Sequence, residues 1–194
     1  MPFALRPFLT ALTLPLALAA ALAAPLHRVM AQDAFDAKSA AHLRDEYLGD
    51  LDSLHVKILA LANAIPADKY SWRPAPGVRS VSEAFMHVAS EWFFYVPQSI
   101  GRKPPADFGV PKETMKSLEK ITTKHEVIAQ LDKSWKHTKT EVSAADASTL
   151  TGSYKPWNQP LDRAAFEMAG DLHEHLGQLI TYARSIGVKP PWSK

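Results

Sequence analysis

The sequence predicts an all-α protein built as a four-helix bundle. Four long segments carry apolar residues at every third or fourth position, which is the period of one helix face. No segment shows the sustained alternation with turn signals that is typical of strands. The chain has 194 residues, of which 46% are hydrophobic, so one domain with a substantial core is expected. Four amphipathic helices of this length are typical of a four-helix bundle.

The first helix is expected between about residues 35 and 65. Its apolar stripe consists of Leu43, Tyr47, Leu51, Leu54, Ile58, Leu61 and Ile65. Pro66 ends this helix, because proline cannot continue it.

The second helix begins at the capping box Ser80-Val81-Ser82-Glu83. In this motif the Ser80 hydroxyl accepts from the backbone amide of Glu83, and the Glu83 carboxylate accepts from the backbone amide of Ser80. Pro97 is expected to kink its last turn, and "GRKPP" from Gly101 ends it.

The third and fourth helices have equally clear beginnings. Thr123-Lys124-His125-Glu126 repeats the capping signature, and one apolar face continues to about Val142. A weaker helical piece, "KETMKSLEK", precedes it. The fourth helix is expected to open with Pro160, a residue suited to the first helical position, and to end near Ile186. Gly187 then fits a C-terminal cap.

The N-terminal residues 1–31 have the pattern of a secretory signal peptide. Arg6 precedes an apolar run that is short for a membrane span, which needs about 20 residues, and Val29-Met30-Ala31 suits cleavage after Ala31. We therefore expect residues 32–194 to form the mature domain, exported to the periplasm or secreted. An uncleaved membrane anchor is the alternative.

Charge and composition exclude several classes of function. The chain has 22 Lys and Arg residues; without Arg6 and Arg28 it has 20, which equals its 20 Asp and Glu residues. A neutral domain lacks the basic face that nucleic acids require, so no nucleic-acid partner is expected, and no membrane partner after signal cleavage. Cysteine is absent, so any metal site must use histidine and oxygen ligands. Phosphate-loop, dinucleotide, G-x-S-x-G and H-E-x-x-H motifs are also absent.

The segment DLHEHLGQ, residues 171–178, and the second helix supply candidate metal ligands. Asp171 and His175 lie one turn apart on one face of the fourth helix, whereas His173 falls on the opposite flank. His87 shares a row of the second helix with Glu91. His87, Asp171 and His175 therefore offer two nitrogens and a carboxylate to one divalent cation, with Glu91 as a hydrogen-bond partner or an extra ligand. The alternative is that these are structural histidines at the edge of the core.

Two segments, "KYSWRPAPGVRSVSEAFMHVA" and "DLHEHLGQLITYARSIGVKPPW", resemble the DinB-like superfamily in their motifs, order and separation. The resemblance implies a bundle with helices in up-down-down-up order. It also implies a site of three histidines that binds zinc, nickel or a similar cation. His87 and His175 match two of these positions, but Asp171 stands where the family has the third histidine. Some members are thiol-dependent transferases or isomerases, although export weakens that reading here because such thiols are mainly cytosolic.

We therefore expect an exported, metal-dependent hydrolase or transferase that acts on a small molecule and uses zinc or nickel. The alternative is a non-catalytic binding or stress-related bundle whose metal site has degenerated, and Asp171 favours that alternative. A homodimer is also expected. The resemblance supports it, as do the four aromatic residues Trp92, Phe93, Phe94 and Tyr95, which cover every side of one helical turn and cannot all face one bundle core.

Overall fold

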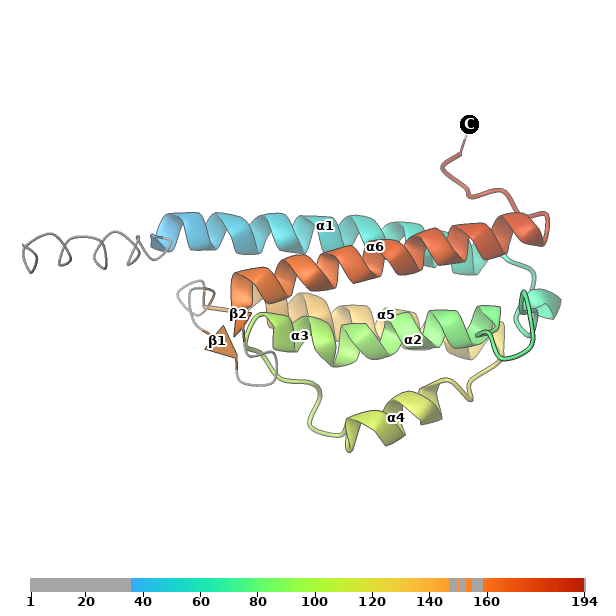
Figure 1. The fold of residues 1–194 in the computed structure, drawn as a ribbon, viewed down its shortest axis with the longest axis horizontal. Helices are drawn as coiled ribbons and strands as arrows, with labels where there is room; N and C mark the ends of the chain where they lie inside the picture. The colour runs from blue at the N-terminus through green and yellow to red at the C-terminus, as the bar shows by residue number, and fades with distance from the viewer. Residues whose placement is uncertain (1–35, 147–149, 151–152, 155–158, 194) are drawn as a thin grey trace, which may run out of the picture. The chain divides into compact units, whose positions relative to one another are not determined.

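Four main α-helices form the folded part of the chain: α1 (Ala37–Ala64), α2 (Val81–Phe93), α5 (Lys124–Ser143) and α6 (Leu161–Ser185) (Figure 1). The computed structural model describes residues 36–146, 150, 153–154 and 159–193. The all-α prediction is confirmed. The predicted signal segment, residues 1–31, lies outside the described residues. No helix in the described part of the chain is long and apolar enough to cross a membrane.

Shorter elements fill the connections. A 3₁₀ helix, η1 (Ala67–Lys69), follows α1, and α3 (Tyr95–Ser99) follows α2. The weak helical signal before the third helix corresponds to α4 (Pro111–Leu118). Strands β1 (Ser153–Tyr154) and β2 (Gln159–Pro160) pair antiparallel before α6. The sequence did not predict this pair, since two residues are too few to produce a readable alternation.

The predicted helix ends are confirmed at most positions. The amide of Ser80 donates to Glu83 Oε2 at 2.7 Å, and the amide of Glu83 donates to Ser80 Oγ at 3.3 Å, which completes the capping box of α2. Thr123 caps α5. Pro160 is the residue before α6 rather than its first residue, because its carboxyl side is extended (ψ 145°) and it pairs in β2. Gly187 ends α6 with φ +79°, a conformation that glycine adopts without strain.

The core lies between the four main helices. Both α1 and α2 pack against both α5 and α6, and α4 lies against α2. The apolar stripe read from the first helix is buried, and its fully buried members include Leu51, Leu54, Ile58 and Leu61. Because α2 and α6 are in contact, residues on their facing rows come together, although they are distant in sequence. This contact positions the site.

The expected kink near Pro97 is a complete break between α2 and α3. Proline has no amide hydrogen to donate to the carbonyl of Phe93, four residues earlier, and its ring also clashes there. The backbone changes direction at Phe94, with φ −117° and ψ −64°. Phe108 from the following loop packs on both Phe93 and Phe94, with ring centroids 5.9 and 5.5 Å away. A loop of the same chain therefore covers part of the aromatic turn.

Candidate metal centre

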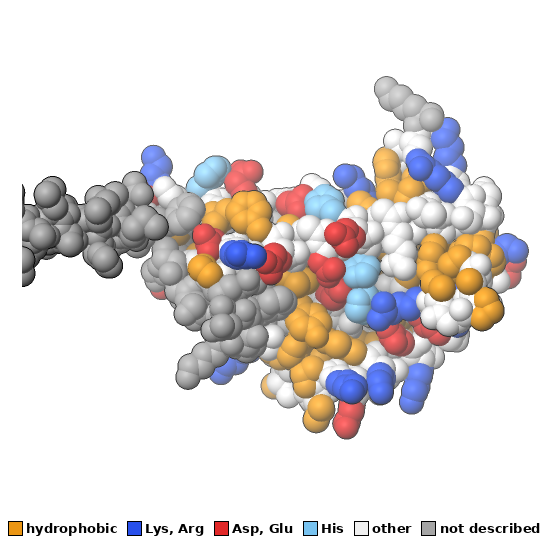
Figure 2. All heavy atoms as spheres, in the orientation of Figure 1, with side chains coloured by type: hydrophobic (Ala, Val, Ile, Leu, Met, Phe, Trp, Pro, Cys, Tyr) orange, Lys and Arg blue, Asp and Glu red, His pale blue; other side chains and the backbone are white. Residues whose placement is uncertain are grey.

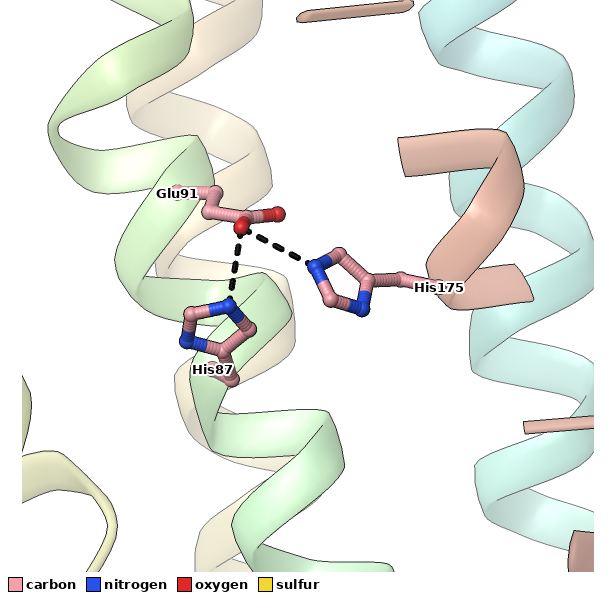
Figure 3. Close-up of side chains that lie close together, drawn as sticks. All are labelled: His87, Glu91 and His175. Atoms are coloured by element: carbon pink, nitrogen blue, oxygen red, sulfur yellow. Dashed lines mark hydrogen bonds and ion pairs between the residues drawn. The ribbon is translucent and has the colours of Figure 1, made fainter. Parts of the chain in front are cut away.

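The helical repeat of α2 and α6 brings the site together. His87 and Glu91 are one turn apart on α2, and Asp171 and His175 are one turn apart on α6. Since α2 packs against α6, the imidazole of His175 points across to the α2 row (Figure 3). All three residues predicted from the sequence lie at this contact. The structure adds Glu91 at its centre.

Both imidazoles meet one oxygen of Glu91. The Nε2 atoms of His87 and His175 lie 3.0 and 3.2 Å from Glu91 Oε1. The two rings meet edge to face, with centroids 4.7 Å apart and planes at 84°. One ligand atom from each of these three residues lies within 4.8 Å of the others. Two imidazole nitrogens and a carboxylate oxygen that converge on one point form a donor set that binds divalent cations such as zinc.

Glu91 is a buried charge with an unused oxygen. The residue is only 3% exposed, and Glu91 Oε2 has no hydrogen-bond partner among the described residues. Burial by itself would raise the pKa of Glu91, but hydrogen bonds from His175 and His87 and their positive charge outweigh it and lower the pKa to about 2. A buried carboxylate that stays ionised requires compensating positive charge. A cation between the carboxylate and the imidazoles would supply that charge and use the free oxygen.

A chain of hydrogen bonds orients His175. Its Nδ1 lies 3.3 Å from Gln178 Oε1, and Gln178 Nε2 donates to the hydroxyl of Tyr182 at 3.2 Å. The Tyr182 hydroxyl in turn donates to the carbonyl of Arg79 at 3.1 Å. An amide oxygen can only accept, so Nδ1 carries the proton, and Nε2 of the neutral ring faces the Glu91 carboxylate as a second acceptor. Either a second proton or a cation must therefore lie between them.

The surroundings of His175 favour its protonated form when no cation is bound. The hydrogen bond to Glu91 raises the pKa of His175 despite partial burial, and the negative charges of Glu91 and Asp171 raise it further. In the absence of a cation, a proton on Nε2 of His175 therefore compensates the negative charge of Glu91. Protons and metal compete for the same nitrogen, as is general for histidine ligands.

Asp171 lies at the edge of the group. Its Oδ2 is 3.7 Å from His175 Nε2, and its side chain is 46% exposed. Burial raises the pKa of Asp171, and so does the nearby negative charge of Glu91. His173 turns away as its helical angle predicts, and its Nε2 lies 3.0 Å from Asp50 Oδ1 on α1. Asp171 is therefore available from the solvent side, while His173 takes no part.

The position of Glu91 in the sequence indicates that it shares a helix face with His87. It follows His87 by four residues on the row that the sequence analysis identified, so a shared direction was predictable. Its depth was not predictable, because depth depends on how far α2 is rotated toward α6. The converging donors, the free buried oxygen and the oriented imidazole together fit a divalent cation.

Fold and site define the class of this protein: it is a helical bundle in which histidines and a buried carboxylate from two helices can hold a metal ion. The family model of the DinB superfamily matches residues 50–179, which is more than half of the chain. The chain belongs to the DinB superfamily, and the resemblance read from the sequence is confirmed. A comparison with curated proteins found no match, and a comparison with solved structures found none either.

Proposed function

We propose that this protein binds one divalent cation, zinc or nickel, and uses it in hydrolysis or group transfer on a small molecule. His87, Glu91 and His175 are the proposed ligands. Asp171 is the fourth candidate ligand, on the solvent side. Membership of the DinB superfamily and the His/Glu group support this proposal.

The observation that carries the proposal is the environment of Glu91. An ionised carboxylate is almost fully buried between two imidazoles, and its Oε2 accepts no hydrogen bond from the described residues while Asp171 is ionised; a protonated Asp171 would donate to Glu91. Leaving a buried charged acceptor unsatisfied costs more than about 1–3 kcal/mol. A purely structural contact would be expected to satisfy both oxygens, whereas a cation site leaves one for the metal or for its other ligands.

The residues of the chain divide the work of the proposed site. A bound cation would supply Lewis acidity toward an oxygen or sulfur of the small molecule. Glu91 neutralises part of the cation's charge and excludes water from the inner side. Gln178 fixes the ring of His175 so that Nε2 faces the site. The nitrogen and oxygen donors suit zinc and nickel better than magnesium or calcium, which prefer oxygen alone.

Two further parts of the proposal concern the whole chain. We propose the up-down-down-up helix order, because residues 100–123 form a long connection between α3 and α5. A long connection allows the neighbouring helices α2 and α5 to run in the same direction, whereas a tight turn would make them antiparallel.

We also propose export with removal of residues 1–31, on the basis of the signal-like N-terminal sequence.

Metal binding to the untagged protein tests the proposal. The protein is treated with EDTA, dialysed, and titrated with zinc and with nickel against a chromophoric chelator. We expect one tightly bound ion per chain, loss of that ion in His87→Ala, and no change in His173→Ala, which removes an exposed histidine of α6 outside the site. Absence of stoichiometric binding would reject the metal site and favour the alternative, a non-catalytic bundle with a degenerate site.

A further inference from the structure

A hollow of about 470 Å³ opens beside the candidate metal centre, between α2 and α4. His87 forms part of its wall, so the hollow and the metal ligands share a side chain. Arg79, Lys112, Lys116 and Glu119 are the other charged residues that line it. A small molecule in this hollow would lie in contact with the ligand His87.

The hollow has an excess of positive charge. Arg79 Nε donates to Glu119 Oε1 at 2.8 Å, so these two charges largely neutralise each other. Lys112 and Lys116 lie one turn apart on α4, are exposed, and make no ion pair within the part of the chain that the structure describes. The lower part of Figure 2 shows Lys and Arg side chains near the histidines on this face. Two unneutralised ammonium groups remain to meet a bound molecule.

The other side of the centre has the opposite charge. A second hollow of about 400 Å³ is lined by Glu91, Glu167 and Asp171, with Tyr95 in the wall of both hollows. Arg163 Nε donates to Glu167 Oε1 at 2.9 Å, so the negative charge of this side comes from Glu91 and Asp171. An anionic group is therefore attracted to the basic side rather than to this one. The field therefore selects both the sign of the ligand's charge and the direction in which it lies.

We propose that the α2–α4 hollow binds the anionic group of the small molecule, a carboxylate or a phosphate, through Lys112 and Lys116. The other end of the molecule then reaches the centre at His87. This inference rests on the proposed function for the identity of the site, but the binding of the anion itself does not require the metal.

Binding of small anions to the EDTA-treated, dialysed protein tests the inference. The probes are succinate and glycerol 3-phosphate, with succinamide and glycerol as their neutral counterparts, and binding is followed by NMR chemical-shift titration. We expect both or one of the anions to bind with shifts in α2 and α4, and the neutral compounds not to bind. The stronger anion shows whether carboxylate or phosphate is preferred.

Variants of Lys112 and Lys116 test whether these two side chains bind the anion. In Lys112→Glu/Lys116→Glu we expect anion affinity to fall by about tenfold or more, because the variant loses two surface ion pairs with the anion and adds repulsion. Lys120→Glu, a neighbouring exposed lysine outside the hollow, should bind as the wild type does. Equal binding of anions and neutral compounds, or unchanged affinity in the double variant, would overturn the inference.

Zinc affinity is measured on the same samples. Lysine-dependent anion binding in a protein that takes up no zinc would support the anion site and reject the metal-dependent function. Zinc uptake without any anion binding would reject the anion site alone.

Discussion

Glu91 is the residue on which the site depends. The helical repeat places it one turn after His87, and the contact between α2 and α6 closes over it. Burial makes its charge costly, and the two imidazoles lower its pKa to about 2 in spite of that burial. Ionisation of a buried group is thus maintained by partners on two different helices. Each of these partners can be changed separately.

Gln178→Leu should weaken metal binding without unfolding the protein. The amide oxygen of Gln178 holds the Nδ1–H of His175, and loss of such an orienting partner typically lowers metal affinity by about 10–100-fold. Chelator competition with zinc measures the change. Thr181→Ala, which removes an exposed hydroxyl from the same helix, is the control. Wild-type affinity in Gln178→Leu would show that His175 is not oriented by this bond.

Single residues of the site were predictable to different degrees. His87, Asp171 and His175 could be located from helical spacing and from the family resemblance, and all three lie at the α2–α6 contact. The central position of Glu91 was not predictable, because a sequence gives the face of a residue but not its depth. Asp171 has the right direction on α6, yet its short side chain remains 46% exposed at the edge.

At the scale of the helices, His55 of α1 is packed against aromatic residues of α2 and α5. The ring of His55 on α1 stacks on Trp135 of α5 at 4.7 Å and lies 5.7 Å from Trp92 of α2. Its Nε2 has no hydrogen-bond partner among the described residues and lies 3.7 Å from Asp132 Oδ1. Burial lowers the pKa of His55, although the negative charge of Asp132 opposes the shift. The three helices therefore pack around a neutral ring.

This packing should make stability fall with decreasing pH. The unfolded chain protonates His55 near its ordinary pKa of 6.5, whereas the folded chain resists protonation, so the unfolded state binds more protons below that pH. The contribution of His55 to the free energy of unfolding should therefore decrease below pH 6.5, by at most about 1.4 kcal/mol per pH unit. The raised pKa of His175 acts in the opposite direction, so the effect of His55 is the difference between the wild type and a His55 variant.

Urea unfolding at pH 7.5 and 5.5, in EDTA, measures the effect. His55→Phe keeps an aromatic ring between the tryptophans and should reduce the loss between the two pH values. His42→Gln changes an exposed histidine and should leave the loss unchanged. An identical loss in His55→Phe and the wild type would show that His55 does not contribute.

The main helices were predictable because local signals and periodicity agree there. Ser80, Thr123 and Gly187 mark helix ends through chemistry that acts within four residues. Features that depend on distant contacts were missed or displaced. The β1–β2 pair involves only two residues on each side, and Pro160 joins that pair instead of starting α6.

At the scale of the whole molecule, the oligomeric state remains a prediction. Phe108 covers part of the aromatic turn that suggested a dimer, but Phe166 on α6 is 69% exposed, and exposed apolar side chains often mark interfaces. We expect a dimeric mass by light scattering at high micromolar concentration. A monomeric mass under these conditions would reject the dimer.

Export is the second prediction for the whole chain. Val29-Met30-Ala31 provides the small or β-branched residues that signal peptidase requires at its cleavage site. We expect the mature protein to begin at Gln32 when it is produced in an exporting host, and intact-mass spectrometry of the exported fraction measures this directly. A mass that includes residues 1–31 would indicate a retained anchor.

The location of a bound metal tests the central proposal most directly. A crystal of the zinc-loaded, untagged protein, with data collected at the zinc absorption edge, gives the position of the ion independently of the protein coordinates. We predict an anomalous peak about 2.0–2.2 Å from Nε2 of His87, from Nε2 of His175 and from an oxygen of Glu91. No peak at this position, or a peak only at the exposed His173–Asp50 pair, would contradict the proposal.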